Sequence, residues 1–158
     1  MQRSSVFERS VDLDAPIDEV YAFHLDTRNA PLISPAGAAF LSIEGNFPVT
    51  VGSEVRLRVR QSPIPFAQTW VIRIPELQPS TLVVDEAVKS PFAQWRHEHR
   101  FEDLGSGRTR MTDHITYRLP FGPIGRLIDR LVARKQLETM FTDRHVRTQA
   151  HFLGSTKP

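Results

Sequence analysis

The sequence contains no cysteine. This absence excludes disulfide bonds, thiolate nucleophiles and zinc sites built on cysteine. No stretch approaches the roughly 20 apolar residues that a membrane-spanning helix needs, and residues Met1–Val11 contain no apolar core of signal-peptide length. We therefore expect a cytoplasmic protein.

An excess of charge of one sign is also missing. Lysine and arginine number 20 against 18 acidic residues, which gives a net charge of +2. So small an excess does not build the concentrated basic face of a nucleic-acid-binding protein, and we expect no nucleic-acid partner. With 158 residues, 40% of them hydrophobic and 24% charged, the composition is typical of one globular domain spanning residues 1–158.

The hydrophobic pattern predicts both strands and helices. A strand is expected at Val6–Asp14, and a short helix follows from Pro16 to about Asp26, with a further turn at Asn29–Leu32. Six more strands are expected at Phe40–Glu44, Glu54–Gln61, Phe66–Ile74, Thr81–Lys89, Phe92–Leu104 and Arg108–Leu119. The connections between them are too short for parallel crossovers, so the sheet should be an antiparallel meander. Helical spacing returns from Ile124 to Phe152.

Two motifs accompany this order of elements. One is Ala15-Pro16-x-x-x-Val20-Tyr21-x-Phe23, and the other is the run SPFAQWRHEHRFEDLGSGRTRMTDHITYRLPFGPIGRLIDRL from Ser90 to Leu131. Together they resemble the SRPBCC superfamily of START, pollen-allergen-like and polyketide cyclase proteins, and within it the bacterial ligand-binding SRPBCC subgroup. The resemblance implies an α+β helix-grip fold, in which a curved antiparallel sheet of about seven strands wraps around a long C-terminal helix. It supplies no catalytic residue, because the scaffold hosts carriers, cyclases and regulators.

Strand parity places several polar residues on the inner face. Alternate residues of Phe92–Leu104 share a face, so Trp95, His97, His99 and Phe101 should point inward together. The next strand should turn Met111, Asp113, Ile115 and Tyr117 to the same side. Because Gly105-Ser106-Gly107 joins the two strands in a tight turn, Asp113 is expected near His97 or His99.

His97, His99, Asp113 and Tyr117 are therefore the candidate catalytic residues. A carboxylate beside imidazoles suits acid–base chemistry, but the same four residues also fit a satisfied hydrogen-bond network or simple polar contacts to a ligand. Two histidines and a carboxylate can hold zinc or iron. Since His-x-His on a strand is a weak signal and no further ligand is evident, we expect no metal and no other cofactor.

A ligand cavity of roughly 300–1,000 Å³ is expected beneath the long helix. Its wall should be formed by Val55, Leu57, Val59, Gln68, Trp70, Ile72, Trp95, His97, His99, Phe101, Met111, Asp113, Ile115, Tyr117, Leu127 and Leu131. From the helix, Leu127, Leu131, Leu137 and Phe141 are expected to be buried over the sheet.

The leading hypothesis is the binding, transport or sequestration of a small hydrophobic molecule such as a lipid, an isoprenoid or a polyketide-like aromatic. The alternative is a cyclase or dehydratase that uses the same cavity without a metal. A regulatory module acting through the outer face of the sheet is a third reading. Arg126, Arg130 and Arg134 leave transient contact with a membrane open, although the interspersed acidic residues favour a solvated face. The chain is expected to be a monomer or a homodimer.

Overall fold

The computed structural model describes residues 3–155 and confirms the antiparallel meander. The strands pair in the order β1-β7-β6-β5-β4-β3-β2, and every pairing is antiparallel. Their bounds are β1 Ser5–Leu13, β2 Ala38–Glu44, β3 Glu54–Gln61, β4 Gln68–Gln78, β5 Leu82–Lys89, β6 Gln94–Gly105 and β7 Arg108–Arg118. Only the connection from β1 to β2 is long, and it carries the short helices. The first strand therefore lies at one edge, beside the last strand.

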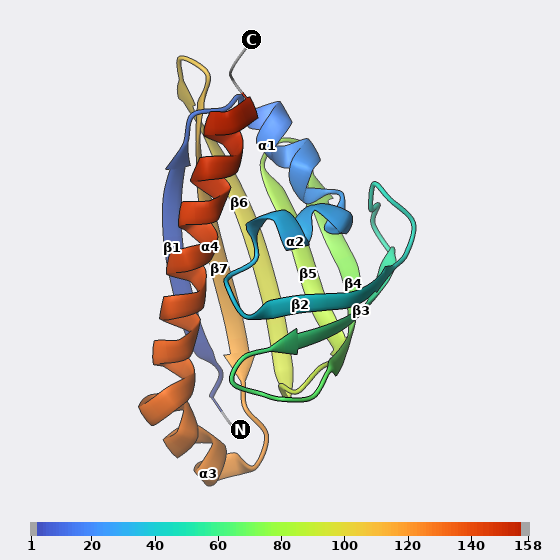
Figure 1. The fold of residues 1–158 in the computed structure, drawn as a ribbon, viewed down its shortest axis with the longest axis vertical. Coiled ribbons are helices and arrows are strands. Elements are labelled where there is room, and N and C mark those ends of the chain that lie inside the picture. Colours follow the sequence, from blue (N-terminus) through green and yellow to red (C-terminus); the bar gives the residue numbers. More distant parts are fainter. Residues whose placement is uncertain (1–2, 156–158) are drawn as a thin grey trace.

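The sheet is strongly curved. Figure 1 shows β2 and β3 crossing the view, while β1, β7 and β6 run along the length of the molecule. Shifts in the pairing register interrupt β2 beside β3 between Phe40 and Ser42, and β4 beside β5 between Arg73 and Glu76. Pro75 lies inside the second of these irregular stretches, where a residue without an amide hydrogen is tolerated. Such irregularities bend strands and give the sheet a concave inner face.

Helices occupy that concave face. After β1 come α1 (Ile17–His24), the 3-10 turn η1 (Thr27–Asn29) and α2 (Ala30–Ile33). After β7, a continuous helix runs through α3 (Gly122–Ile128), a π-helical segment η2 (Asp129–Ala133) and α4 (Arg134–Ser155). In Figure 1, α4 lies along β1 and β7, with α1 and α2 near its C-terminal end and α3 at the opposite end. The predicted helix-grip arrangement is therefore confirmed.

The main core lies where α4 meets the sheet. Leu137 and Phe141 from the helix are buried against Phe7, Ile115 and Tyr117 of β1 and β7. Further along the helix, Phe152 joins a second cluster whose fully buried members come from α1, β1, β5 and β7. Removing apolar side chains of this size from water stabilises a fold by about 1.5–3 kcal/mol each. The helix is thus an integral part of the core.

The beginning of the long helix differs from the prediction. Leu127 and Leu131 were expected to be buried, but their exposed fractions are 59% and 68%. The expectation assumed an unbroken period of 3.6 residues from Ile124 to Phe152. The π-helical segment Asp129–Ala133 has a wider turn, so the residues before it are rotated out of phase with the buried stripe of α4.

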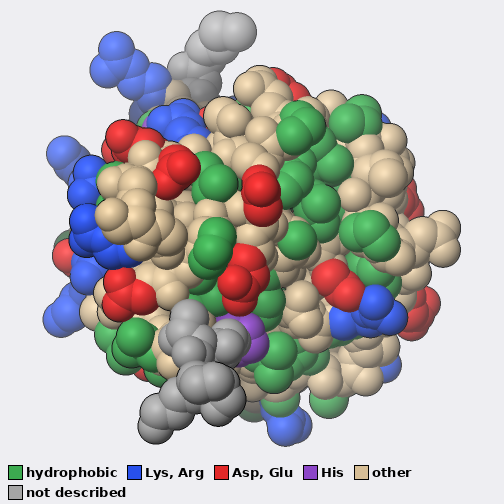
Figure 2. Space-filling view, turned by 90° about the horizontal axis from the view of Figure 1, so that it is seen from above, with side chains coloured by type: hydrophobic (Ala, Val, Ile, Leu, Met, Phe, Trp, Pro, Cys, Tyr) green, Lys and Arg blue, Asp and Glu red, His purple; other side chains and the backbone are tan. Residues whose placement is uncertain are grey.

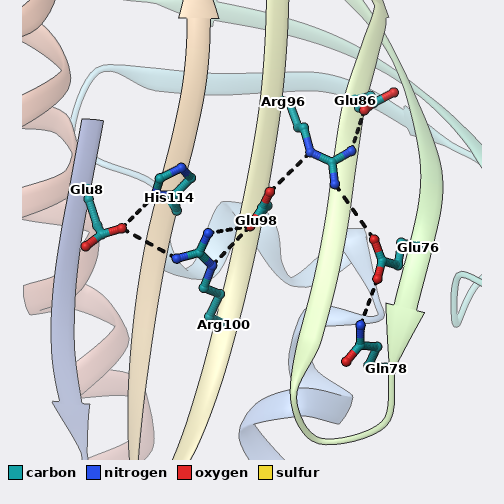
Figure 3. Close-up of polar contacts among 8 residues, drawn as sticks. All are labelled: Glu8, Glu76, Gln78, Glu86, Arg96, Glu98, Arg100 and His114. Atoms are coloured by element: carbon teal, nitrogen blue, oxygen red, sulfur yellow. Dashed lines mark hydrogen bonds and ion pairs between the residues drawn. The ribbon is translucent and has the colours of Figure 1, made fainter. Parts of the chain in front are cut away.

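The outer face of the sheet is polar and solvated. Side chains from five neighbouring strands form one connected set of ion pairs and hydrogen bonds, consisting of Glu8, His114, Arg100, Glu98, Arg96, Glu86, Glu76 and Gln78 (Figure 3). Exposed pairs of this kind each contribute only about 0–1 kcal/mol. The end of the molecule where α4 ends likewise shows acidic and basic side chains interspersed with hydrophobic ones (Figure 2). Within residues 3–155, no helix is long and apolar enough to cross a membrane.

Candidate functional site

A cavity of about 490 Å³ lies between the curved sheet and the helices, within the volume range expected from the sequence. The predicted wall residues that line it are Val55, Leu57, Val59, Gln68, Trp70, Ile72, Trp95, His97 and His99. The long helix adds Leu137, Met140 and Phe141, and α2 adds Ile33. Most of the wall is therefore aliphatic or aromatic, and Asp85, His97 and His99 form a polar cluster on β5 and β6.

The other predicted wall residues lie outside the cavity. They are Phe101, Met111, Asp113, Ile115, Tyr117, Leu127 and Leu131. Met111 and Ile115 are fully buried on β7, but α4 packs directly on this side of the sheet and fills the space that parity alone had assigned to a ligand. The cavity is displaced toward β3, β4 and β5, where the sheet curves away from the helix.

The histidines of β6 face inward, as strand parity predicts. The exposed fractions of His97 and His99 are 5% and 6%. Asp113 of β7, which lies opposite His99 in the register of β6 and β7, is fully buried. Oδ1 of Asp113 accepts a hydrogen bond from Nε2 of His97 at 2.6 Å. Nδ1 of His99 lies 3.0 Å from the same oxygen, near enough for an ion pair but not aligned for a hydrogen bond. The expected contact between Asp113 and the two histidines is confirmed.

Two residues that the sequence analysis did not single out complete this cluster. Asp85 lies opposite His97 in the register of β5 and β6, and its Oδ2 is 3.1 Å from Nε2 of His99 and 3.8 Å from Nδ1 of His97. His145, one turn beyond Phe141 on α4, donates from Nε2 to Oδ2 of Asp113 at 2.5 Å. Asp113 is thus a buried carboxylate shared by three imidazoles, and Asp85 lines the cavity together with His97 and His99.

The pKa values of His97 and His99 are shifted in opposite directions. Burial alone would lower the pKa of His99, but its contacts with Asp113 and Asp85 outweigh burial and raise that pKa to about 9. Burial lowers the pKa of His97, and the neighbouring positive charge of His99 lowers it further. Burial opposes ionisation of Asp113 too, yet its histidine partners hold its pKa well below the usual value. His99 is therefore the imidazole that holds the extra proton.

His24, at the end of α1, is the third histidine that lines the cavity, after His97 and His99. Its ring centroid lies 5.3 Å from that of His99, and its Nδ1 is 2.7 Å from the carbonyl oxygen of Val20. Burial lowers its pKa to about 3, so the ring is neutral and Nε2 carries the lone pair. Within the described part of the chain, that shielded Nε2 has no hydrogen-bond partner. An unmet bond of this kind costs about 1–3 kcal/mol, which a ligand hydroxyl in the cavity would remove.

Tyr117 does not belong to the histidine cluster. Its hydroxyl donates to Oδ1 of Asp129 at 2.5 Å, and Ser5 donates to the other oxygen of that carboxylate at 2.5 Å. Burial and the hydrogen bond to Asp129 raise the pKa of Tyr117. These contacts hold the first residue of the π-helical segment against β1 and β7. The structure therefore places Tyr117 at the base of the helix, away from a reacting group in the cavity.

The site combines a hydrophobic chamber with one polar end. Its histidine nitrogens can donate or accept hydrogen bonds, and their tautomers are set by Asp113 and Asp85. One ligand-type atom of each of Asp85, His97 and His99 lies within 4.8 Å of those of the other two, so these residues could also hold a metal ion. Asp85 on β5 and His145 on α4 belong to this polar cluster, so the β6–β7 hairpin alone did not reveal it.

Solved structures share this architecture at low sequence identity. The chain is similar to the Zhui aromatase/cyclase from Streptomyces sp. R1128, with 20% identity, a TM-score of 0.70, and coverage of 97% of this chain and 93% of that one. It is also similar to a START superfamily protein from Mycobacterium smegmatis, with 13% identity, a TM-score of 0.69, and coverage of 96% and 99%. A truncated norcoclaurine synthase from Thalictrum flavum shows 12% identity, a TM-score of 0.67, and coverage of 91% and 92%. At these identities the likeness shows the fold alone.

The sequence itself carries a family match. No curated protein sequence matches the chain. Residues 13–141, however, match the family described as polyketide cyclase / dehydrase and lipid transport, and that stretch runs from the end of β1 into α4. Since the match spans more than half of the chain, the protein belongs to this family, which agrees with the resemblance to polyketide cyclases carried by its sequence motifs.

Proposed function

We propose that the protein binds a small hydrophobic molecule, such as a lipid, an isoprenoid or a polyketide-like aromatic, in the cavity beneath the long helix. The observation that carries this proposal is the chamber of about 490 Å³, whose wall is mostly apolar. Specific ligand pockets have this volume and this composition, with a few polar groups that fix the orientation of the ligand. Here His24, His97, His99 and Asp85 form one cluster of such polar groups in the wall.

The orientation of the ligand follows from this asymmetry. Trp70, Trp95 and Phe92 contact one another and form an aromatic part of the wall on β4 and β6. An apolar ring or chain is expected against these side chains, because leaving water stabilises it there by about 25 cal/mol for each Å² buried. A hydroxyl group of the ligand is expected at the histidine end, because Nε2 of His24 can accept its hydrogen bond and lacks a partner among the described residues.

Native mass spectrometry of the protein purified from its own host tests this proposal. We expect a co-purifying small molecule on the wild-type protein and its loss in Leu57→Trp, which places a large ring in the cavity. The matched control is Leu41→Trp, an exposed leucine on the neighbouring strand β2. A ligand that stays bound in Leu57→Trp, or that is lost equally in both variants, would show that this cavity is not the binding site.

A second candidate function is a cyclase or dehydratase reaction in the same chamber. The observation in its favour is that His97 and His99 line the cavity while carboxylates fix the orientation of both rings. Oriented imidazoles can take a proton from a carbon next to a carbonyl group and return it to a leaving hydroxyl, and such transfers contribute about 10²- to 10⁴-fold to a rate.

Incubation with a poly-β-ketone thioester would separate the two functions. An enzyme releases a cyclised product that has lost water, detected by mass spectrometry. His99→Gln should reduce its formation about 10²-fold or more, the lower end of the range for acid–base effects. The matched control is His114→Gln, because His114 also contacts a carboxylate but lies on the outer face of the sheet. A thioester that is bound and recovered unchanged favours the carrier.

A further inference from the structure

The polar end of the cavity contains a complete set of metal-ligand side chains. His97, His99 and Asp113 were the candidate ligands predicted from the sequence, in which no further ligand is evident. The structure supplies it in Asp85, which lines the cavity beside His97 and His99. Two histidines and one carboxylate with open positions form a ligand set that zinc and ferrous iron both use.

The ligand atoms of the three side chains lie within 4.8 Å of one another, and the two separations that involve Asp85 fit a single ion. Oδ2 of Asp85 lies 3.1 Å from Nε2 of His99 and 3.8 Å from Nδ1 of His97. Bonds of about 2.0–2.2 Å at tetrahedral angles place neighbouring ligand atoms about 3.4 Å apart, midway between these two distances. Because His97 and His99 are alternate residues of one strand, the backbone of β6 presents both rings on the same side.

The surroundings of the histidines match those of a metal site. Nε2 of His97, the nitrogen turned away from Asp85, donates to the buried carboxylate of Asp113. This bond leaves the lone pair of Nδ1 on the side of Asp85, which is the tautomer that a metal requires. Nδ1 of His99 also lies 3.0 Å from Asp113. Carboxylates that orient the rings of metal-binding histidines in this way are a regular feature of metal sites.

We infer that Asp85, His97 and His99 bind one divalent transition-metal ion, such as Zn²⁺ or Fe²⁺, with Asp113 orienting both histidines. The ion takes the place of the proton that joins His99 to Asp85. Its remaining positions face the cavity, where Nε2 of His24 also lacks a partner among the described residues.

The charge at this end also indicates what the ion would hold. Two carboxylates, one divalent ion and the guanidinium of Arg144, which lines the same cavity, leave one positive charge when the histidines are neutral. An oxygen anion, such as an enolate, a phenolate or a carboxylate, would balance it. The site would therefore select hydrophobic molecules with an ionisable oxygen at one end.

Titration of the metal-free chain with Zn²⁺ alone, followed by isothermal calorimetry, tests the inference. We expect one ion per chain. Asp85→Asn and His97→Gln each remove a ligand and should weaken binding at least tenfold, and Asp113→Asn should weaken it about 10- to 100-fold through the orientation of the histidines. The matched controls are Glu86→Gln and His114→Gln on the outer face, which should leave the affinity within twofold.

A second measurement keeps the inference testable if a variant fails to fold. Crystals of the wild-type chain grown with Zn²⁺ should show an anomalous scattering peak between Asp85, His97 and His99. The inference is overturned if the folded chain shows no saturable Zn²⁺ binding, if the affinity is unchanged in Asp85→Asn, or if the peak lies elsewhere. The experiment uses the metal without any hydrophobic ligand, so its failure leaves the proposed binding function intact.

Discussion

The two halves of the C-terminal helix share one backbone but meet different surroundings. In α4, the side chains of Leu137, Phe141 and Phe152 are buried over the sheet and cover the cavity or its neighbouring core. In α3 and the π-helical segment, Leu127 and Leu131 are exposed. One half of the helix therefore stabilises the fold, while the other contributes little apolar burial.

The boundary between the halves coincides with a specific set of contacts. Asp129 begins the π-helical segment and accepts hydrogen bonds from Tyr117 and Ser5. Earlier in the helix, Gly125 lies so close to the carbonyl oxygen of Pro120 that an added Cβ would be 2.1 Å from it. Ile128 and Val132 of this half also line the cavity. We predict that the first half is a hinged edge of the cavity and the route for ligand entry.

The largest effect is expected when the whole helix is removed. A chain that ends after Pro120 loses Leu137, Phe141 and Phe152, each worth about 1.5–3 kcal/mol when buried. Their sum is comparable with the entire stability of a domain, about 5–15 kcal/mol. We expect circular dichroism to show no cooperative thermal unfolding. A truncated chain that melts cooperatively would show that the sheet is stable without α4.

Phe141→Ala should produce the largest effect of a single substitution. Phe141 contacts Phe7 and His97, with ring centroids 5.3 Å and 5.6 Å away, and is buried. Truncating a buried phenylalanine lowers the free energy of unfolding by about 3–5 kcal/mol, and urea denaturation would measure the change. The matched control is Leu131→Ala in the exposed half. Equal losses in the two variants would remove the distinction between the halves.

Tyr117→Phe should have an intermediate effect, confined to the hinge. It removes a hydrogen bond to a carboxylate, which costs about 1.5–3 kcal/mol, without changing the packing of the ring. We expect faster amide hydrogen exchange at residues 122–133 and unchanged exchange in α4. Ser5→Ala, which removes the other bond to Asp129, is the comparison variant. Uniform acceleration along the entire chain would contradict a local hinge.

Much of the fold could be predicted because it follows from local patterns. Alternating apolar residues, β-branched and aromatic segments and the turn residues between them located every strand of the described sheet, and β3 was predicted with its observed bounds, Glu54–Gln61. Parity also placed His97, His99 and Asp113 correctly, since β6 and β7 are joined by a tight turn and pair in a continuous register until Asp103. The contacts within a regular hairpin can be predicted without knowing how the rest of the molecule folds.

The missing parts of the site depend on contacts between distant elements. Asp85 becomes a neighbour of His97 only through the register of β5 on β6. His145 lies one turn after Phe141 on the buried stripe of α4, so the helical period could have marked it as inward. Its contact with Asp113, however, depends on how the helix sits on the sheet. The prediction that Leu127 and Leu131 are buried was wrong because a π-helical segment leaves no recognisable signal in hydrophobic periodicity.

Those two leucines give the smallest expected effect and the most sensitive test of the comparison. The double variant Leu127→Ser/Leu131→Ser changes exposed side chains only, so we expect the free energy of unfolding to change by no more than about 0.5 kcal/mol for each substitution. Chemical denaturation at two protein concentrations would measure it, with Leu137→Ala as the buried control.

A loss near that of the control, present only at the higher concentration, would mean that the exposed leucines are covered by a second copy of the chain. Reduced sedimentation of the double variant with anionic vesicles, at unchanged stability, would instead identify this half as the surface of a transient membrane contact.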